Sequence, residues 1–235
     1  MLVKTKAIVI SSLRYQEKSL IVKCFTREAG LKSYFVRNAF SGRTAQKIAY
    51  FQPLTLLEIE AVHKNKGTLE HFREIKLATA YQTINTDVVK STIILFVSEV
   101  LHHSIKEEER NEDLFAFLET ALHWLDHHDE VANFHLILLL ETSKFLGFYP
   151  DVSTGNRFFE MTEGIFTEDH GISCLSEAET HLLQRLLKHK FGSDQKVFSA
   201  NERQILLKIL LDYYSVHLDG FRKPKSLEVL REVFA

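Results

Sequence analysis

The sequence predicts an α+β protein in which a small five-stranded β-barrel precedes an α-helical domain. Two patterns change at the same boundary. Short apolar stretches separated by polar turns fill residues 1–80, whereas residues 81–235 place apolar residues three and four apart, as amphipathic helices do. The charge also changes sign there, from 14 Lys and Arg against 6 Asp and Glu in residues 1–80 to 15 against 25 in residues 81–235. We therefore expect two domains, 1–80 and 81–235.

The first 80 residues contain the candidate strands. Gly30 ends a short turn of the hairpin kind, where glycine accepts backbone angles that other residues avoid. The fourth candidate alternates, with Leu57 and Ile59 on one face and glutamates on the other. Short strands with one longer connection, 38–52, are typical of an OB-type barrel, and an SH3-like barrel is the alternative. The expected strands are 7–10, 20–26, 31–37, 54–62 and 69–77.

The rest of the chain is expected to be helical. Ser176 and Ser199 are each followed three residues later by Glu, which is the capping-box pattern that begins a helix. Asp113 and Asp129 are candidate N-terminal caps or first-turn carboxylates, and Gly147 is expected to end the third helix. The expected helices are 91–103, 113–127, 131–148, 176–190 and 199–217, with a last helix after Pro224 and an irregular insertion at about 150–175.

The sequence contains no motif that predicts an enzyme. Both common glycine-rich phosphate loops are missing from it, as is the G-x-S-x-G elbow of serine hydrolases. His123 and His127 are spaced to share one helix face, as chelating pairs are, but they lack the H-E-x-x-H arrangement and lie at a predicted helix end. We expect structural or solvated histidines, no catalytic residue, no metal and no cofactor; a metal-dependent hydrolase using residues 123–129 is the alternative.

The remaining signals concern the cellular compartment. The N-terminus carries no apolar run of signal-peptide length, and no segment approaches the roughly 20 apolar residues that cross a bilayer. The two cysteines, Cys24 and Cys174, give no disulfide framework. We therefore expect a soluble cytoplasmic protein with reduced thiols and no membrane partner.

Basic and aromatic residues alternate along the predicted barrel, a pairing that favours nucleic-acid binding. Cations follow the phosphates of a strand, while flat rings stack on unpaired bases. The competing interpretation is that the cations are solvated surface and that strand aromatics such as Phe25, Tyr34 and Phe35 belong to the core. No residue is placed to read base edges, so we expect little sequence specificity. The candidate nucleic-acid-binding residues are Arg14, Tyr15, Lys18, Arg27, Lys32, Arg37, Phe40, Arg43, Lys47, Lys64 and Lys66.

Several short strings, taken in order, resemble the RecO family of bacterial recombination mediators. Each string is weak alone, but their order and spacing cover the chain from end to end. The middle helices match in pattern more than in letters. The strings are 7–10, Arg14-Tyr15, 17–19, Phe25-Thr26, Gly30, 51–53, 56–58, 145–150, 217–221 and Lys225-Ser226.

The resemblance implies an N-terminal OB domain and a C-terminal helical domain in a nucleoid-associated protein. It implies binding of single- and double-stranded DNA and annealing of complementary strands. It also implies that the protein acts with RecR to load RecA onto DNA coated by single-stranded DNA-binding protein. It further implies docking of that protein's acidic, apolar C-terminal tail on the helical domain, for which Lys144 is a candidate cation. The alternatives are an RNA-binding OB protein or a protein-interaction adaptor without annealing activity.

One departure from the family concerns zinc. Many members carry a four-cysteine zinc module after the string at 145–150, but residues 151–173 contain no cysteine. We therefore expect an insertion without zinc, held by the apolar packing of Phe158, Phe159, Ile165 and Phe166.

Overall fold

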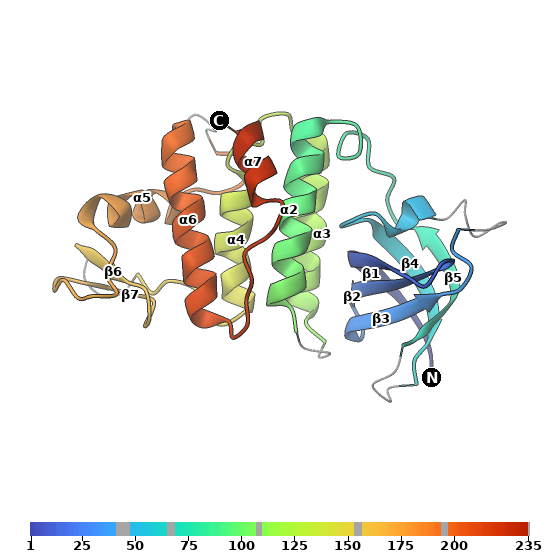
Figure 1. Cartoon of the computed structure of the whole chain (residues 1–235). Coiled ribbons are helices and arrows are strands. Elements are labelled where there is room, and N and C mark those ends of the chain that lie inside the picture. Colours follow the sequence, from blue (N-terminus) through green and yellow to red (C-terminus); the bar gives the residue numbers. More distant parts are fainter. Residues whose placement is uncertain (41–47, 65–68, 107–109, 153–156, 194–196, 235) are drawn as a thin grey trace. The chain divides into compact units, whose positions relative to one another are not determined.

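The computed structural model describes residues 1–40, 48–64, 69–106, 110–152, 157–193 and 197–234 (Figure 1). The chain forms two compact units, Met1–His127 and His128–Ala235. The first unit contains the five-stranded sheet, a 3-10 turn η1 (Ile48–Phe51) and the helices α2 (Val88–Ser104) and α3 (Glu112–His127). The second contains α4 (Phe134–Phe145), α5 (Glu177–Leu187), α6 (Ala200–His217), α7 (Leu227–Val233) and the short strands β6 (Phe158–Glu160) and β7 (Ile165–Thr167). The division of functions at residue 80 stays a prediction.

The predicted five strands are confirmed, and they form one antiparallel sheet in the order β3-β2-β1-β4-β5. The edge strands approach each other at Glu70, whose N–H donates to Ser33 O (2.8 Å) and whose carbonyl accepts from Phe35 N (2.9 Å). This parallel bridge is isolated, so the sheet does not close into a barrel with a continuous ladder, as an ideal OB barrel would. The strands are β1 (Leu2–Tyr15), β2 (Ser19–Thr26), β3 (Gly30–Val36), β4 (Leu56–Val62) and β5 (His71–Leu77).

β1 is much longer than the apolar run 7–10 from which it was predicted. Its first half alternates exposed and buried residues, so Lys4 interrupts the apolar pattern without interrupting the strand. Residues such as Val9, Val22 and Tyr34 point to the inner face of the sheet and pack together there as a hydrophobic core. Phe25 faces outward and is nonetheless buried, because its ring lies 5.9 Å from that of Phe115 on α3. Part of the outer face is therefore covered by helices.

Local capping signals were predicted well. Ser176 and Ser199 both form complete capping boxes, and Gly147 follows α4 with the positive φ of +85° that suits glycine. Asp129 is wrong as a cap, because a turn over residues 131–134 intervenes and α4 begins after Asn133. No helix in the described part of the chain is long and apolar enough to cross a membrane.

The insertion contains a small hairpin, β6–β7, rather than irregular chain alone. Phe159 is 0% exposed, and its ring lies 5.0 Å from Phe166 and 5.4 Å from Tyr213 of α6. Phe158 and Phe166 are buried as predicted, whereas Ile165 is only half-buried. Gly164 must be glycine, because its φ is +70° and a Cβ there would lie 2.3 Å from the Tyr213 hydroxyl.

A buried carboxylate fixes the connection between the sheet and α2. Asp126, near the end of α3, accepts the backbone N–H groups of Gln82, Thr83 and Ile84 at 2.9–3.1 Å. Burial raises the pKa of Asp126, but these donors outweigh burial and hold the pKa below its ordinary value. The charged form is therefore the one that stabilises the fold.

Replacing Asp126 by alanine is expected to lower the free energy of unfolding by about 3 kcal/mol, because three backbone donors lose a charged acceptor. A carboxyl whose pKa is depressed by folding contributes stability above its unfolded-state pKa of about 4 and loses it as pH falls through the lower folded-state value. Urea unfolding at pH 7 and below pH 4 measures both effects. Equal destabilisation of Asp126→Ala at the two pH values would contradict the assignment.

Candidate nucleic-acid interface

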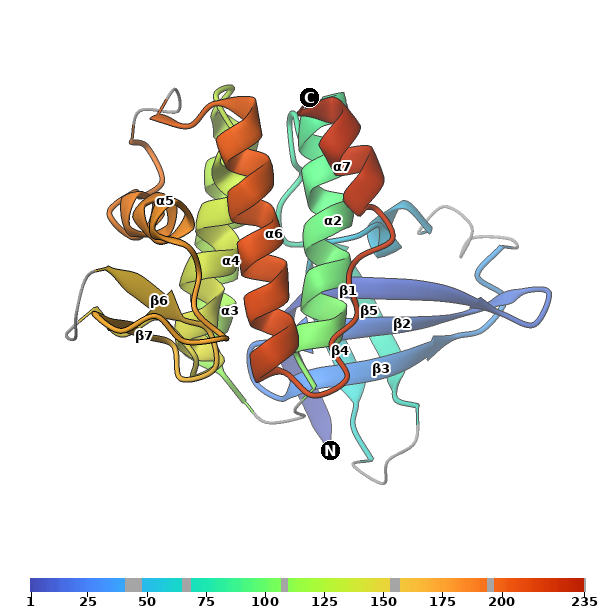
Figure 2. The ribbon, with the colours of Figure 1, turned by 60° about the vertical axis from the view of Figure 1, so that its left-hand side comes forward.

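The end of the β1–β2 hairpin brings several predicted residues together. Arg14 and Tyr15 lie at the end of β1 and Lys18 lies in the turn that follows, all of them exposed. This end of the hairpin points away from α2 and α3 (Figure 2). Arg14 donates to Glu17 O at 2.9 Å, which holds its guanidinium close to the turn. The hairpin therefore presents cations on well-defined backbone.

Aromatic rings lie beside these cations on both faces of the hairpin end. On the outer face, the ring of Phe35 meets Tyr15 edge-on at 6.1 Å and His71 edge-on at 6.2 Å. On the other face, the Arg14 guanidinium lies 4.8 Å from the ring of Phe40. Tyr15 is 43% exposed and Phe40 is 39% exposed, so both offer ring surface to a ligand. Exposed rings beside cations are what stacking on unpaired bases requires.

The alternation of β3 settles which of its aromatics belongs to the core. Tyr34 is buried, stacks on Phe72 at 4.1 Å and pairs its hydroxyl with His63 Nε2 at 2.8 Å. Phe35 points to the opposite face and is half-buried. His71 was not predicted as part of the interface. Its position opposite Phe35 depends on the β3–β5 approach, which no local pattern in the sequence indicates.

Arg37 and Lys64 are both exposed, but only Arg37 lies near the hairpin end, because Lys64 follows β4 where Val62 pairs with Leu2 at the opposite end of β1. Arg37 is the first residue of the turn that follows β3, next to Val36, which pairs with Leu20 near the start of β2. Lys64 follows β4, and its backbone N–H donates to Glu70 Oε2 at 2.8 Å. Among described residues, Arg14, Lys18, Arg37 and Lys64 take part in no ion pair. Their charges are available to an anion.

Two predicted residues do not join this cluster. Lys32 faces the same side of β3 as Tyr34 and is only 9% exposed, so its stem lies in the sheet interior. Arg27 lies at the opposite end of β2, roughly 25–30 Å from Lys18 at about 3.3 Å per strand residue. Neither residue fits a DNA contact at the hairpin end. Arg43, Lys47 and Lys66 lie outside the described residues.

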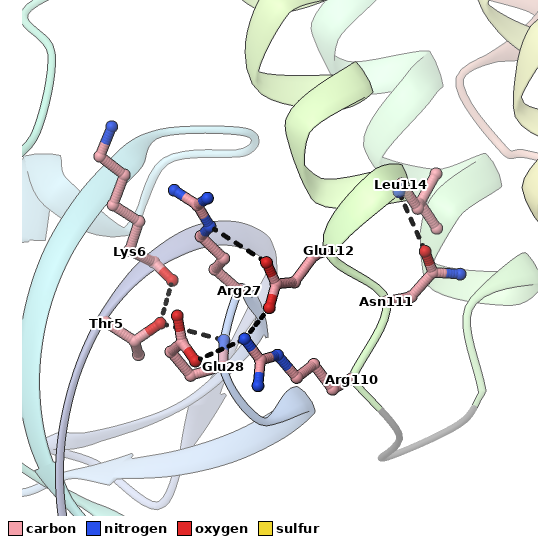
Figure 3. A network of polar contacts seen from close by, with 8 residues as sticks. All are labelled: Thr5, Lys6, Arg27, Glu28, Arg110, Asn111, Glu112 and Leu114. Atoms are coloured by element: carbon pink, nitrogen blue, oxygen red, sulfur yellow. Dashed lines mark hydrogen bonds and ion pairs between the residues drawn. The ribbon is translucent and has the colours of Figure 1, made fainter.

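Arg27 belongs instead to an ion-pair network between the β2–β3 turn and the start of α3 (Figure 3). Its Nε lies 4.0 Å from Glu112, and Arg110 pairs with both Glu112 and Glu28, the latter at 3.2 Å. Lys6 on β1 pairs with Glu119 of α3 at 2.7 Å. These contacts attach α3 to the sheet, so the cations in them serve the fold.

The outer face of β1, β4 and β5 carries charges that cancel. Glu60 pairs with both Lys4 and Arg73 at 3.2 Å, and Lys76 pairs with Glu74 at 2.9 Å. A pocket of about 390 Å³ is lined mainly by lysines and glutamates of these strands, among them Lys4, Glu60 and Lys76. The positive excess of residues 1–80 is therefore concentrated elsewhere, at the hairpin end and the neighbouring connections.

The second unit contains an apolar pocket next to Lys144. The pocket has a volume of about 450 Å³. Lys144 Nζ lies 4.4 Å from the Tyr149 ring centre and pairs with Glu141 at 2.5 Å, a carboxylate that it shares with Lys190. Lys188 is exposed at the pocket and forms no ion pair with a described residue; sequence reasoning missed it. The lining residues are Tyr149, Val152, Phe166, Gln184, Leu187 and Lys188.

The histidine cluster of α3 shows no metal-site geometry. His127 Nδ1 lies 2.7 Å from the carbonyl oxygen of His123, so this nitrogen is turned toward the backbone. Within the described ranges, no group of three or more His, Cys, Asp or Glu side chains is arranged to hold a metal ion.

Comparison with known proteins gives matches over nearly the whole chain. Residues 1–81 match the family described as "Recombination protein O N terminal", and residues 85–228 match "Recombination protein O C terminal". Proteins named "DNA repair protein RecO" are 68% identical in Flavobacterium psychrophilum, 69% identical in Flavobacterium johnsoniae and 40% identical in Christiangramia forsetii. Each of these alignments covers 100% of both chains.

Proposed function

The chain belongs to the RecO family, and on this premise we propose that it acts in DNA repair as a recombination mediator. It binds single- and double-stranded DNA and anneals complementary strands. Together with RecR, it helps to load RecA onto DNA that is coated by single-stranded DNA-binding protein. The protein contributes binding and juxtaposition of strands, and no bond in the DNA is made or broken.

The observation that carries this proposal is the concentration of exposed cations and rings at the end of the β1–β2 hairpin. Arg14, Lys18 and Arg37 would neutralise phosphates, while Tyr15 and Phe40 would stack on bases. In OB folds, the face of the second and third strands and the loops beside it bind oligonucleotides, which agrees with this location. Stacking requires unpaired bases, so this surface favours a single strand over a duplex.

Annealing follows from neutralisation. Two complementary strands repel each other through their phosphates, and a strand held by cations repels its complement less. Contacts to phosphates and to a few bases leave the remaining base edges free to pair. The surface needs no sequence specificity for this task, in agreement with the expectation from the sequence that no residue reads base edges.

The decisive experiment is annealing of complementary oligonucleotides that are first coated with single-stranded DNA-binding protein. The full chain should accelerate duplex formation on the coated strands, followed by the fluorescence of a donor–acceptor pair. Acceleration on naked strands alone would contradict a mediator role, because many cationic proteins anneal naked DNA. An equal-length RNA competitor that displaces DNA equally well would favour the RNA-binding alternative.

We further propose that the acidic, apolar C-terminal tail of single-stranded DNA-binding protein docks in the pocket beside Lys144. A peptide of this kind needs an apolar recess for its tip and a cation for its carboxylates. Val152, Phe166 and Leu187 supply the recess, and Lys188 supplies an exposed cation at its edge. Lys144 retains a role through Tyr149, whose ring it covers.

Replacing Val152 by aspartate should weaken binding of the tail peptide at least tenfold. Val152 is 65% exposed, so the change should leave the fold intact while it removes apolar contact and adds repulsion. Fluorescence titration of the labelled peptide against the full chain measures the effect. Val216→Asp is the matched control, because Val216 is also an exposed valine and lies in α6. Equal weakening by both variants would exclude this pocket.

A further inference from the structure

The connection between α6 and α7 forms a basic segment in an otherwise acidic unit (Figure 2). Residues 128–235 contain 12 Lys and Arg against 16 Asp and Glu. Three cations are nevertheless gathered within four positions of this connection, namely Arg222, Lys223 and Lys225, and all three are exposed. We propose that this segment is a second phosphate-binding surface, which holds the backbone of a second DNA strand.

The backbone of the segment is fixed, so its cations are presented at low entropic cost. Gly220 has a φ of +67°, and the Phe221 N–H donates to Leu218 O at 3.0 Å. The Phe221 ring lies 5.5 Å from that of Tyr214, which is fully buried in α6. Pro224 is buried between the exposed cations. Residues that pack against the rest of the unit therefore alternate with cations that are exposed to solvent.

The segment carries more positive charge than the neighbouring carboxylates can neutralise. Asp212 of α6 pairs with Lys223 at 2.7 Å and with Lys208 at 3.6 Å, so one carboxylate is shared by two lysines. Arg222 and Lys225 take part in no ion pair with any described residue. Even when Asp219 is counted, these four cations face two carboxylates. A net positive surface of this kind attracts a polyanion.

The chemistry of the segment selects phosphates rather than bases. An arginine fork binds a phosphate through two donors, and a lysine binds it as a point charge. Phe221, the aromatic residue of the segment, packs its ring against Tyr214, so this ring is not presented to a base for stacking. The segment should therefore bind single strands and duplexes alike. A protein with one base-stacking surface and one backbone-only surface can hold two strands at once, as annealing requires.

This inference rests on the proposed DNA-binding function, and the test separates the two. Two non-complementary oligo-dT strands, one with a donor dye and one with an acceptor, are mixed with the full chain. Energy transfer then reports strands held together. In Arg222→Glu/Lys225→Glu, capture of the second strand should weaken by at least about 25-fold at 0.1 M salt, since two lost phosphate contacts remove about 1.4 from the salt slope and the glutamates add repulsion. Binding of the first strand should change less than twofold.

The swap Arg222→Lys/Lys225→Arg keeps the charge and should keep wild-type capture of the second strand. A wild-type chain that binds no DNA would refute the proposed function itself. A wild-type chain that captures two strands, with capture unchanged in the glutamate variant, would overturn only this inference. Equal loss of both strands in that variant would also overturn it, because the segment would then be part of a single site. Loss of acidic-peptide binding with unchanged DNA capture would assign the segment to a protein partner instead.

Discussion

Replacing Arg14 and Arg37 together by glutamine will weaken binding of a single-stranded oligonucleotide about 25-fold at 0.1 M salt. Each phosphate contact on a single strand adds about 0.7 to the steepness of log K against log salt, so two lost contacts remove about 1.4. Over the tenfold change from 1 M to 0.1 M salt, this difference in slope amounts to a factor of about 25 in affinity. Both side chains are exposed and form no ion pair among described residues, so their loss should not disturb the fold. Fluorescence anisotropy at several salt concentrations gives the affinity and the slope.

The matched control is the double variant Lys4→Gln/Arg73→Gln. It removes the same formal charge from the same sheet, but from cations that are already paired with Glu60. Its affinity for the oligonucleotide should stay within about twofold of wild type. If both double variants weakened binding equally, DNA would be attracted by net charge alone, and the hairpin end would not be the binding surface.

The parts of the fold that depend on local signals could be predicted from the sequence. The capping boxes at Ser176 and Ser199 involve residues three apart, and the turn at Gly30 needs only one permissive residue. Strand alternation was sufficient to divide Tyr34 from Phe35, although not to say which of them is buried. That choice depends on Phe72 and His63, which are distant in the sequence and contact Tyr34 rather than Phe35.

The candidate interface was predicted less completely, because neighbours across the fold decide whether a cation is available. Arg27 resembles Arg14 in sequence, since each lies beside a turn, but Glu112 on α3 pairs with Arg27 and not with Arg14. Lys32 cannot be distinguished from an exposed strand lysine until the register with Cys24 places it inward. The apolar pocket of the second unit likewise depends on residues that are distant in the sequence. Its lining residues come from three separate segments, and the sequence offered only Lys144 as a guide.

Replacing Phe159 by alanine will lower the free energy of unfolding of the second unit by about 4 kcal/mol. A fully buried phenylalanine typically costs 3–5 kcal/mol when truncated, because contacts are lost and a cavity remains. Phe159 packs against Phe166 of β7 and Tyr213 of α6, and it thus joins the hairpin to the helices. Urea unfolding measures the stability, and hydrogen exchange of residues 157–167 localises the change.

The same variant tests whether aromatic packing holds the insertion together. If aromatic packing holds it, Ile165→Ala should cost less than about 1.5 kcal/mol, because Ile165 is only half-buried. The tail peptide should bind Phe159→Ala more weakly, because Phe166 lines the pocket and rests on Phe159. Added zinc should restore neither property, since residues 151–173 contain no cysteine. Recovery of stability with zinc, or equal costs for Phe159→Ala and Ile165→Ala, would contradict packing as the stabilising force.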